Sequence, residues 1–145
     1  MAKIPRTLQP HIDAAFPANV CLIGTVLSNG HAQITPRGST MCYDDDHIGL
    51  WERGSGSTAE NMADGTKVTV YFRNPKLRED GTLPRGGIAR LYGTAKIYKS
   101  GPEYEEVWRR LIAPEKERDP DKKGYAVLVK IHRAEDLAGE LLKFD

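Results

Sequence analysis

A chain of 145 residues is long enough to bury one hydrophobic core without disulfides or a structural metal, so we expect a single domain over residues 1–145. The 21 Lys and Arg residues nearly balance the 20 Asp and Glu residues, and a net charge of +1 gives no general attraction to nucleic acid or to an anionic membrane. The two cysteines form no Cys-x-x-Cys pair, residues 1–20 carry no signal-peptide pattern, and no apolar run is long enough to span a bilayer. These features predict a soluble, cytoplasmic protein.

The first half of the chain predicts a short helix followed by three strands. Residues 5–15 fit the helix, and residues 20–27 (VCLIGTVL) carry no charge, which predicts a central strand buried on both faces. Asn29 and Gly30 form a turn of the kind that favours positive φ, so residues 31–40 are expected to return as the partner strand of a hairpin. Residues 47–53 predict the next strand, and residues 58–62 look helical.

The second half predicts three further strands separated by a helix and loops. Residues 67–73 alternate, with Val68, Val70 and Phe72 on the face that we expect to be buried. A Pro/Gly-rich excursion (74–87), a strand (88–99), a helix opened by Pro102 (102–113), a charged loop (114–123) and a last strand (125–132) follow. Six strands in hairpin order predict a mainly β fold with minor α content, a mostly antiparallel barrel with short helices at its ends.

Polar side chains recur along one face of the second strand. Alternation places Gln33, Thr35 and Arg37 on that face and Ile34 and Pro36 on the other. An amide, a hydroxyl and a guanidinium in a row suit a planar heterocycle with a phosphate tail, and we expect Arg37 to line an open cleft. The alternative is a polar strand face that only meets solvent.

The Gly/Ser segment after the third strand is the second candidate. The hydroxyls of Ser55, Ser57 and Thr58, together with unpaired N–H groups at the start of a helix, suit a phosphate group. The alternative is a capping box, because Ser57 and Glu60 have the spacing that satisfies those N–H groups internally.

Trp51 and Arg53 are expected to share one face of the third strand. Arg53 is then a second cation near the anion, and Trp51 packs at the wall of the site; the alternative is a core aromatic and a surface charge. The histidines show no His-Glu-x-x-His spacing and the chain has no Gly-x-Ser-x-Gly motif, so we expect neither a metal site nor a hydrolase.

The order of these features resembles that of pyridoxamine 5'-phosphate oxidase-like FMN-binding split-barrel proteins. It covers residues 16–131 and includes the sequence Arg-Asn-Pro at 73–75 and RLYGTA at 90–95. The resemblance implies a six-stranded antiparallel split β-barrel and a homodimer with two FMN sites at its interface. It assigns the FMN phosphate to Arg37, Ser55, Ser57 and Thr58. It places the flavin ring along Gln33, Thr35 and Pro36 near Trp51, with Arg53 and Asn61 as further contacts.

The resemblance implies a flavin-dependent oxidoreductase acting on a small molecule, in which the flavin carries the chemistry and the chain assigns no catalytic acid or base. Two features depart from the family. Ser57-Thr58 stands where many relatives have a Lys, and the chain stops before the C-terminal substrate motif of true pyridoxamine 5'-phosphate oxidases, so we do not expect that activity. The alternatives are a non-catalytic flavin or haem carrier or redox sensor, and a deazaflavin-dependent reductase on the same fold.

Overall fold

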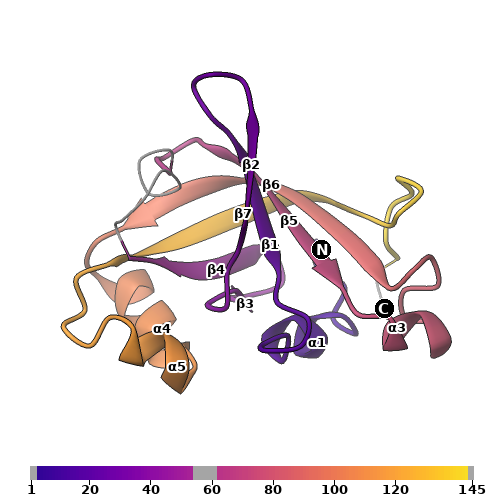
Figure 1. The fold of residues 1–145 in the computed structure, drawn as a ribbon, viewed down its shortest axis with the longest axis horizontal. Helices are drawn as coiled ribbons and strands as arrows, with labels where there is room; N and C mark the ends of the chain where they lie inside the picture. Colours follow the sequence, from indigo (N-terminus) through magenta and orange to yellow (C-terminus); the bar gives the residue numbers. More distant parts are fainter. Residues whose placement is uncertain (1–2, 54–61, 144–145) are drawn as a thin grey trace.

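One curved sheet dominates the structure, a computed structural model that describes residues 3–53 and 62–143 (Figure 1). The described residues form seven antiparallel strands and short helices, so the predicted mainly β split-barrel class is confirmed. The strands are β1 (Leu22–Val26), β2 (Ala32–Pro36), β3 (Met41–Cys42), β4 (His47–Glu52), β5 (Lys67–Arg73), β6 (Ile88–Tyr98) and β7 (Tyr125–Glu135). The helices are α1 (Gln9–Asp13), α3 (Lys76–Glu79), α4 (Pro102–Arg110) and α5 (Ala113–Glu117).

The described residues contain one strand more than the six that we predicted. The additional strand is β3, whose two residues pair with β4, Met41 with Gly49 and Cys42 with Ile48. Such a short strand has no periodicity of its own, because two residues cannot show an alternation. Its pairing is therefore visible only in the tertiary structure.

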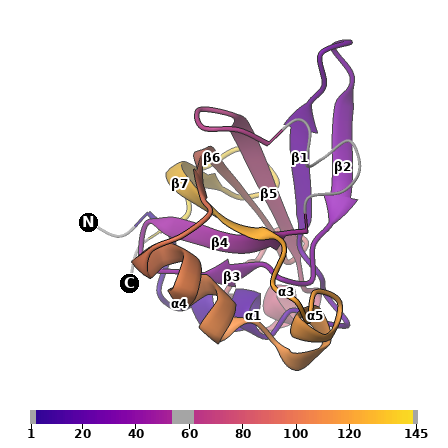
Figure 2. The same cartoon turned by 90° about the vertical axis from the view of Figure 1, so that its left-hand side faces the viewer.

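The sheet runs in the order β2-β1-β5-β6-β7-β4-β3. Figure 2 shows it curving from the upright β1–β2 hairpin through β5, β6 and β7 to β4 and β3, which makes a half-barrel with β2 and β3 at its edges. The hairpin turn is as predicted, since Gly30 has a φ of 87° and Val26 pairs with Ala32. The prediction of a central first strand buried on both faces is wrong: β1 is second from the edge, and Val26 is 64% exposed.

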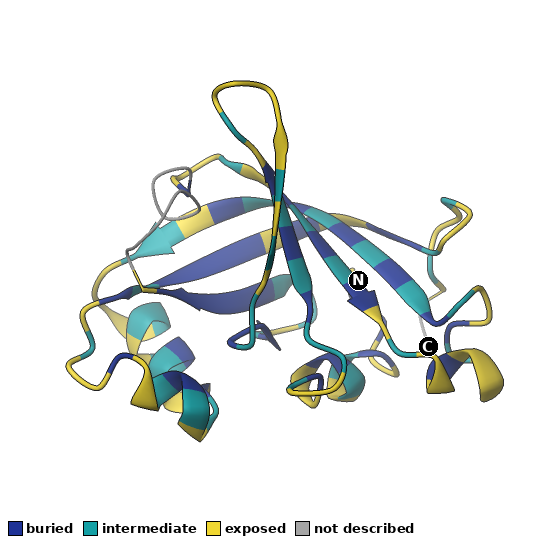
Figure 3. Ribbon diagram, viewed as in Figure 1, coloured by how far each residue is buried: buried dark blue, intermediate teal, exposed yellow. Residues whose placement is uncertain are grey.

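The concave side of the sheet holds the main core. Burial alternates along β5 as predicted, with Val68, Val70 and Phe72 buried, and the same alternation appears on β1 and along most of β6 in Figure 3. These side chains belong to one buried hydrophobic cluster that also includes Ile48 of β4 and Val129 of β7. A second, smaller cluster lies on the other side of β4 and β7, where helix α4 covers the sheet.

The helices differ from the predictions mainly in their ends. The helix expected over residues 102–113 stops at Arg110, because Leu111 and Ile112 are extended and Pro114 then opens the new helix α5. Helix α5 thus lies in the stretch that we predicted to be a charged loop, and α3 lies in the excursion over 74–87. No helix in residues 3–53 and 62–143 is long and apolar enough to cross a membrane.

Candidate functional site

The alternation predicted for the second strand is present in β2. Gln33 and Thr35 are half-buried, whereas Ile34 is 65% exposed on the opposite face. Gln33 pairs with Thr25 and Thr35 with Ile23, two β1 residues that are both buried. Since directly paired residues share a face of the sheet, the polar row lies on the inward side of the hairpin and Ile34 on the outward side.

Arg37 continues this polar face beyond the end of β2. Its guanidinium Nη2 donates a hydrogen bond of 2.5 Å to Oε2 of Glu52, the last residue of β4. The side chains of Arg37 and Glu52 are only 12% and 1% exposed, so our expectation of an arginine lining an open cleft is wrong. Within the described residues, the buried Nε of Arg37 has no hydrogen-bond partner. The guanidinium is therefore held at one end and has an unused donor.

The turn after Arg37 ties the β2 end of the half-barrel to β4. The Arg37 carbonyl accepts a hydrogen bond of 2.8 Å from Thr40 Oγ1. Ser39 Oγ accepts one of 3.1 Å from the backbone N–H of Trp51 and donates one of 3.4 Å to the Trp51 carbonyl. Together with the Arg37–Glu52 pair, these bonds connect the end of β2 to β4, two strands that are not neighbours in the sheet of the described residues.

Trp51 points away from the Arg37–Glu52 pair, because neighbouring residues of a strand face opposite sides. It is 2% exposed and packs against Tyr104 and Trp108 of α4, with ring centroids 5.2 and 5.0 Å away. Its indole Nε1 donates a hydrogen bond of 2.9 Å to Oδ2 of Asp119. Burial raises the pKa of Asp119, but the hydrogen bonds from Trp51 and from two backbone N–H groups outweigh it, and the pKa lies below its ordinary value.

Arg53 is exposed, and its charge helps to lower the pKa of Asp119. The structure therefore brings Arg53 near the Trp51–Asp119 pair and not to the Glu52 side of β4. Four further residues assigned to the phosphate and the flavin, Ser55, Ser57, Thr58 and Asn61, lie outside the described residues.

The outward face of the sheet carries a groove that the sequence did not reveal. Its volume is about 770 Å³, and its walls come from β1, β2, β5, β6 and β7. Mainly apolar and aromatic side chains line it, among them Leu22, Val26, Ile34, Tyr71 and Tyr92. The exposed Val26 and Ile34 stand on the projecting hairpin (Figure 1). The glycine at position 24 was a signal, because it leaves the floor of the groove open in the middle of an apolar strand.

A histidine stands at the far end of this groove. The β6–β7 register shifts between Tyr92 and Gly93, opposite His132, which is typical of a β-bulge that re-aims a side chain. The His132 ring lies with Nε2 2.9 Å from Thr94 Oγ1. Its spacing from the other histidines in the sequence does not single out His132.

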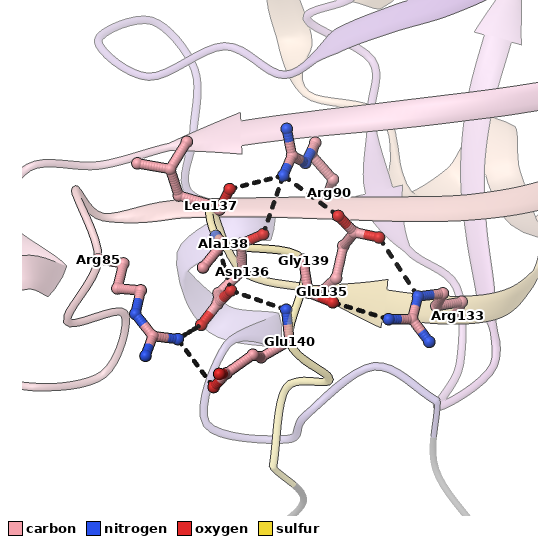
Figure 4. A network of polar contacts seen from close by, with 9 residues as sticks. All are labelled: Arg85, Arg90, Arg133, Glu135, Asp136, Leu137, Ala138, Gly139 and Glu140. Atoms are coloured by element: carbon pink, nitrogen blue, oxygen red, sulfur yellow. Dashed lines mark hydrogen bonds and ion pairs between the residues drawn. The ribbon is translucent and has the colours of Figure 1, made fainter.

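Two other arginines, Arg85 and Arg90, make structural contacts at the C-terminal end of the sheet. In Figure 4, Arg90 reaches the Glu135 carboxylate at 3.1 Å and the carbonyls of Asp136 and Leu137 at 3.1 and 2.8 Å. Arg85 pairs with Asp136 in the same network. These contacts hold the C-terminal turn against β6. Nη2 of Arg90 has three protein partners and Nη2 of Arg37 has one, Glu52, whereas the Nε of each arginine is buried without a partner among the described residues.

The comparisons with known proteins agree with this architecture. The sequence profile of the family described as pyridoxamine 5'-phosphate oxidase matches residues 8–135. The structure of HupZ from Group A Streptococcus is similar with a TM-score of 0.69 and 20% identity, over 97% of this chain and 98% of that chain. An FMN-binding protein from Syntrophomonas wolfei subsp. wolfei has a TM-score of 0.57 and 16% identity, over 95% and 90% of the two chains. An F420 reductase has a TM-score of 0.56 and 13% identity, over 91% and 98%.

At these identities the solved structures establish the fold alone. No match was found among curated proteins.

Proposed function

Because the chain belongs to the pyridoxamine 5'-phosphate oxidase family, we propose that it binds FMN and uses it to oxidise or reduce a small molecule. The observation that carries the proposal is the buried guanidinium of Arg37, whose Nε has no partner within the described residues. Phosphate oxygens satisfy such donors well, because charge-assisted hydrogen bonds to guanidinium are short and strong. A phosphate monoester therefore suits this guanidinium, 12% of whose side chain is exposed.

The neighbouring residues fit the rest of the cofactor. Gln33 and Thr35 lie on the same face as Arg37 and offer an amide and a hydroxyl for the polar edge of a flavin ring. Bound FMN would supply the hydride chemistry, while these side chains bind and orient it. Pro36 lies on the outward face with Ile34, and Trp51 is buried on the side of β4 that faces α4. Neither side chain would contact the cofactor on the inward face, so each would only help to position the backbone of its strand.

We further propose a homodimer in which the outward groove is the contact surface. Strand β2 is an edge strand, and its hairpin exposes Val26 and Ile34 to 64% and 65%. Exposed apolar side chains beside an edge strand favour aggregation, and a protein partner that covers them prevents it. A second copy packed on this face would reach around β2 to the polar face, which brings the cofactor to the interface.

A cytoplasmic location belongs to the same proposal. Cys21 and Cys42 are free and buried, and burial raises the pKa of the Cys21 thiol to about 12. Such inert thiols suit a reducing compartment.

A deazaflavin held by the same side chains is the second candidate, favoured by the structural similarity to an F420 reductase. It shares the polar requirements of flavin, because it also has a ring with carbonyl groups and a phosphate-bearing tail.

Titration of the purified protein with FMN and with riboflavin tests the proposal. We expect a flavin absorbance spectrum and tighter binding of FMN. Arg37→Ala should weaken FMN about 10- to 150-fold, since a charge-assisted hydrogen bond contributes about 1.5–3 kcal/mol, and should leave riboflavin nearly unchanged. Arg53→Ala is the matched control for loss of positive charge.

Equal affinity for FMN and riboflavin would rule out the phosphate site. Binding of a deazaflavin or of haem in place of FMN would move the function to that cofactor. Anaerobic mixing of the FMN-loaded protein with reduced nicotinamide cofactor then separates an oxidoreductase from a carrier, because only the former turns over.

A further inference from the structure

We propose that Glu52 is a counter-ion built into the anion site: it holds the Arg37 guanidinium and competes with a phosphate group for its charge. Glu52 then sets how tightly the site binds phosphate monoesters and how strongly it prefers FMN to riboflavin. This inference rests on the proposed function, which assigns the phosphate to Arg37.

The geometry keeps Arg37 from swinging away from Glu52. The backbone N–H of Arg37 donates a hydrogen bond of 2.9 Å to the Cys21 carbonyl, and its own carbonyl is held by Thr40. The guanidinium then spans to Glu52 at 2.5 Å. With both ends anchored, the guanidinium stays in place, and an anion that reaches the exposed 12% of the Arg37 side chain must bind beside the carboxylate.

The electrostatics of this arrangement oppose the anion. Glu52 is 1% exposed, so little solvent screens its charge, and the pair with Arg37 is neutral as a whole. The negative field also reaches Tyr125, which pairs with Glu52 in the sheet: burial, and then the Glu52 charge, raise the pKa of its hydroxyl. An anion at the Arg37 guanidinium would feel the same repulsion at short range, where the interaction of unit charges amounts to several RT.

The Arg90–Glu135 pair gives a matched comparison within the chain. Glu135 is also buried and also pairs with an arginine, at 3.1 Å. Two backbone carbonyls accept hydrogen bonds from the same guanidinium, whose Nε is also buried without a partner among the described residues. Glu135 also pairs with Arg133 at 3.3 Å, and this network holds the C-terminal turn (Figure 4). Glu135→Gln therefore shows whether the loss of any one negative charge raises the affinity for anions, because it leaves the surroundings of Arg37 unchanged.

The experiment compares Glu52→Gln with Glu135→Gln and the unchanged full chain. Glutamine keeps the shape and an acceptor oxygen for Arg37 but removes the charge. Isothermal titration with inorganic phosphate, FMN and riboflavin measures the three affinities. We expect Glu52→Gln to bind phosphate and FMN about tenfold more tightly or more, with riboflavin unchanged and Glu135→Gln like the unchanged chain.

Unchanged or weaker phosphate binding in Glu52→Gln would overturn the inference, because Glu52 would then only position Arg37. If phosphate binding rises as expected but no variant binds FMN, the proposed function fails and the counter-ion role stands. Should Glu52→Gln be unfolded in buffer, circular dichroism follows the same phosphate titration. Phosphate, but not chloride at equal ionic strength, should then restore the fold, and failure to do so overturns the inference.

Discussion

Replacing Arg37 by Ala should destabilise the protein even without any ligand. The substitution leaves the carboxylate of Glu52, 1% exposed, without its ion-pair partner. Removing one member of a buried pair costs about 3–5 kcal/mol, and because Arg37 itself keeps 12% of its side chain exposed we expect the lower end, about 3 kcal/mol. For a chain of this length that corresponds to a fall in melting temperature of roughly 10 °C.

Urea unfolding followed by circular dichroism measures the free energy of unfolding of the ligand-free protein. The matched control is the double variant Arg37→Met with Glu52→Leu, which replaces the pair by apolar side chains of similar volume. Its stability should lie close to that of the unchanged protein, because no charge is left unpaired. If Arg37→Ala alone stays within about 0.5 kcal/mol of the unchanged protein, the pair does not hold the end of β2 to β4 as we describe.

Two further predictions concern the groove and the second core cluster. Ile34→Asp places a charge on the proposed dimer surface and should convert the protein to a monomer, as measured by light scattering. Leu141→Asp changes a similarly exposed site (63%) outside that surface and should leave the dimer intact. If the Ile34→Asp variant is also a dimer, the proposed interface is wrong. The lowered pKa of Asp119 contributes stability that is complete above the ordinary pKa of about 4 and is lost as pH falls through the lower folded value. The Asp119→Asn variant should therefore lose less stability than the unchanged protein when the pH falls from 5 to 2, as measured by the midpoint of urea unfolding at each pH. Equal losses in the two proteins would show that Asp119 does not contribute to the acid sensitivity.

Part of this architecture is encoded in short stretches of sequence. The β1–β2 turn follows from Asn29 and Gly30, because glycine reaches positive φ without steric cost. The buried face of β5 follows from strict alternation of apolar residues, which any half-buried strand shows. The family resemblance also needed only the order of such local features, and the profile match over residues 8–135 confirms it.

The tertiary structure decided which residues meet. Arg37 follows the end of β2 and Glu52 ends β4, 15 positions further along the chain, and these two strands are not neighbours in the sheet. No local pattern therefore links the two residues, and a buried arginine looks the same in sequence as an exposed one. The same holds for β1, whose uncharged sequence fits a strand buried on both faces. Its outward face instead lines an open groove. The position of β1, one strand from the edge, follows from the order of the strands in the sheet and cannot be read from its own sequence. Local sequence determines periodicity and turns through backbone sterics, whereas partners and exposure depend on contacts that form only when the whole sheet has curved.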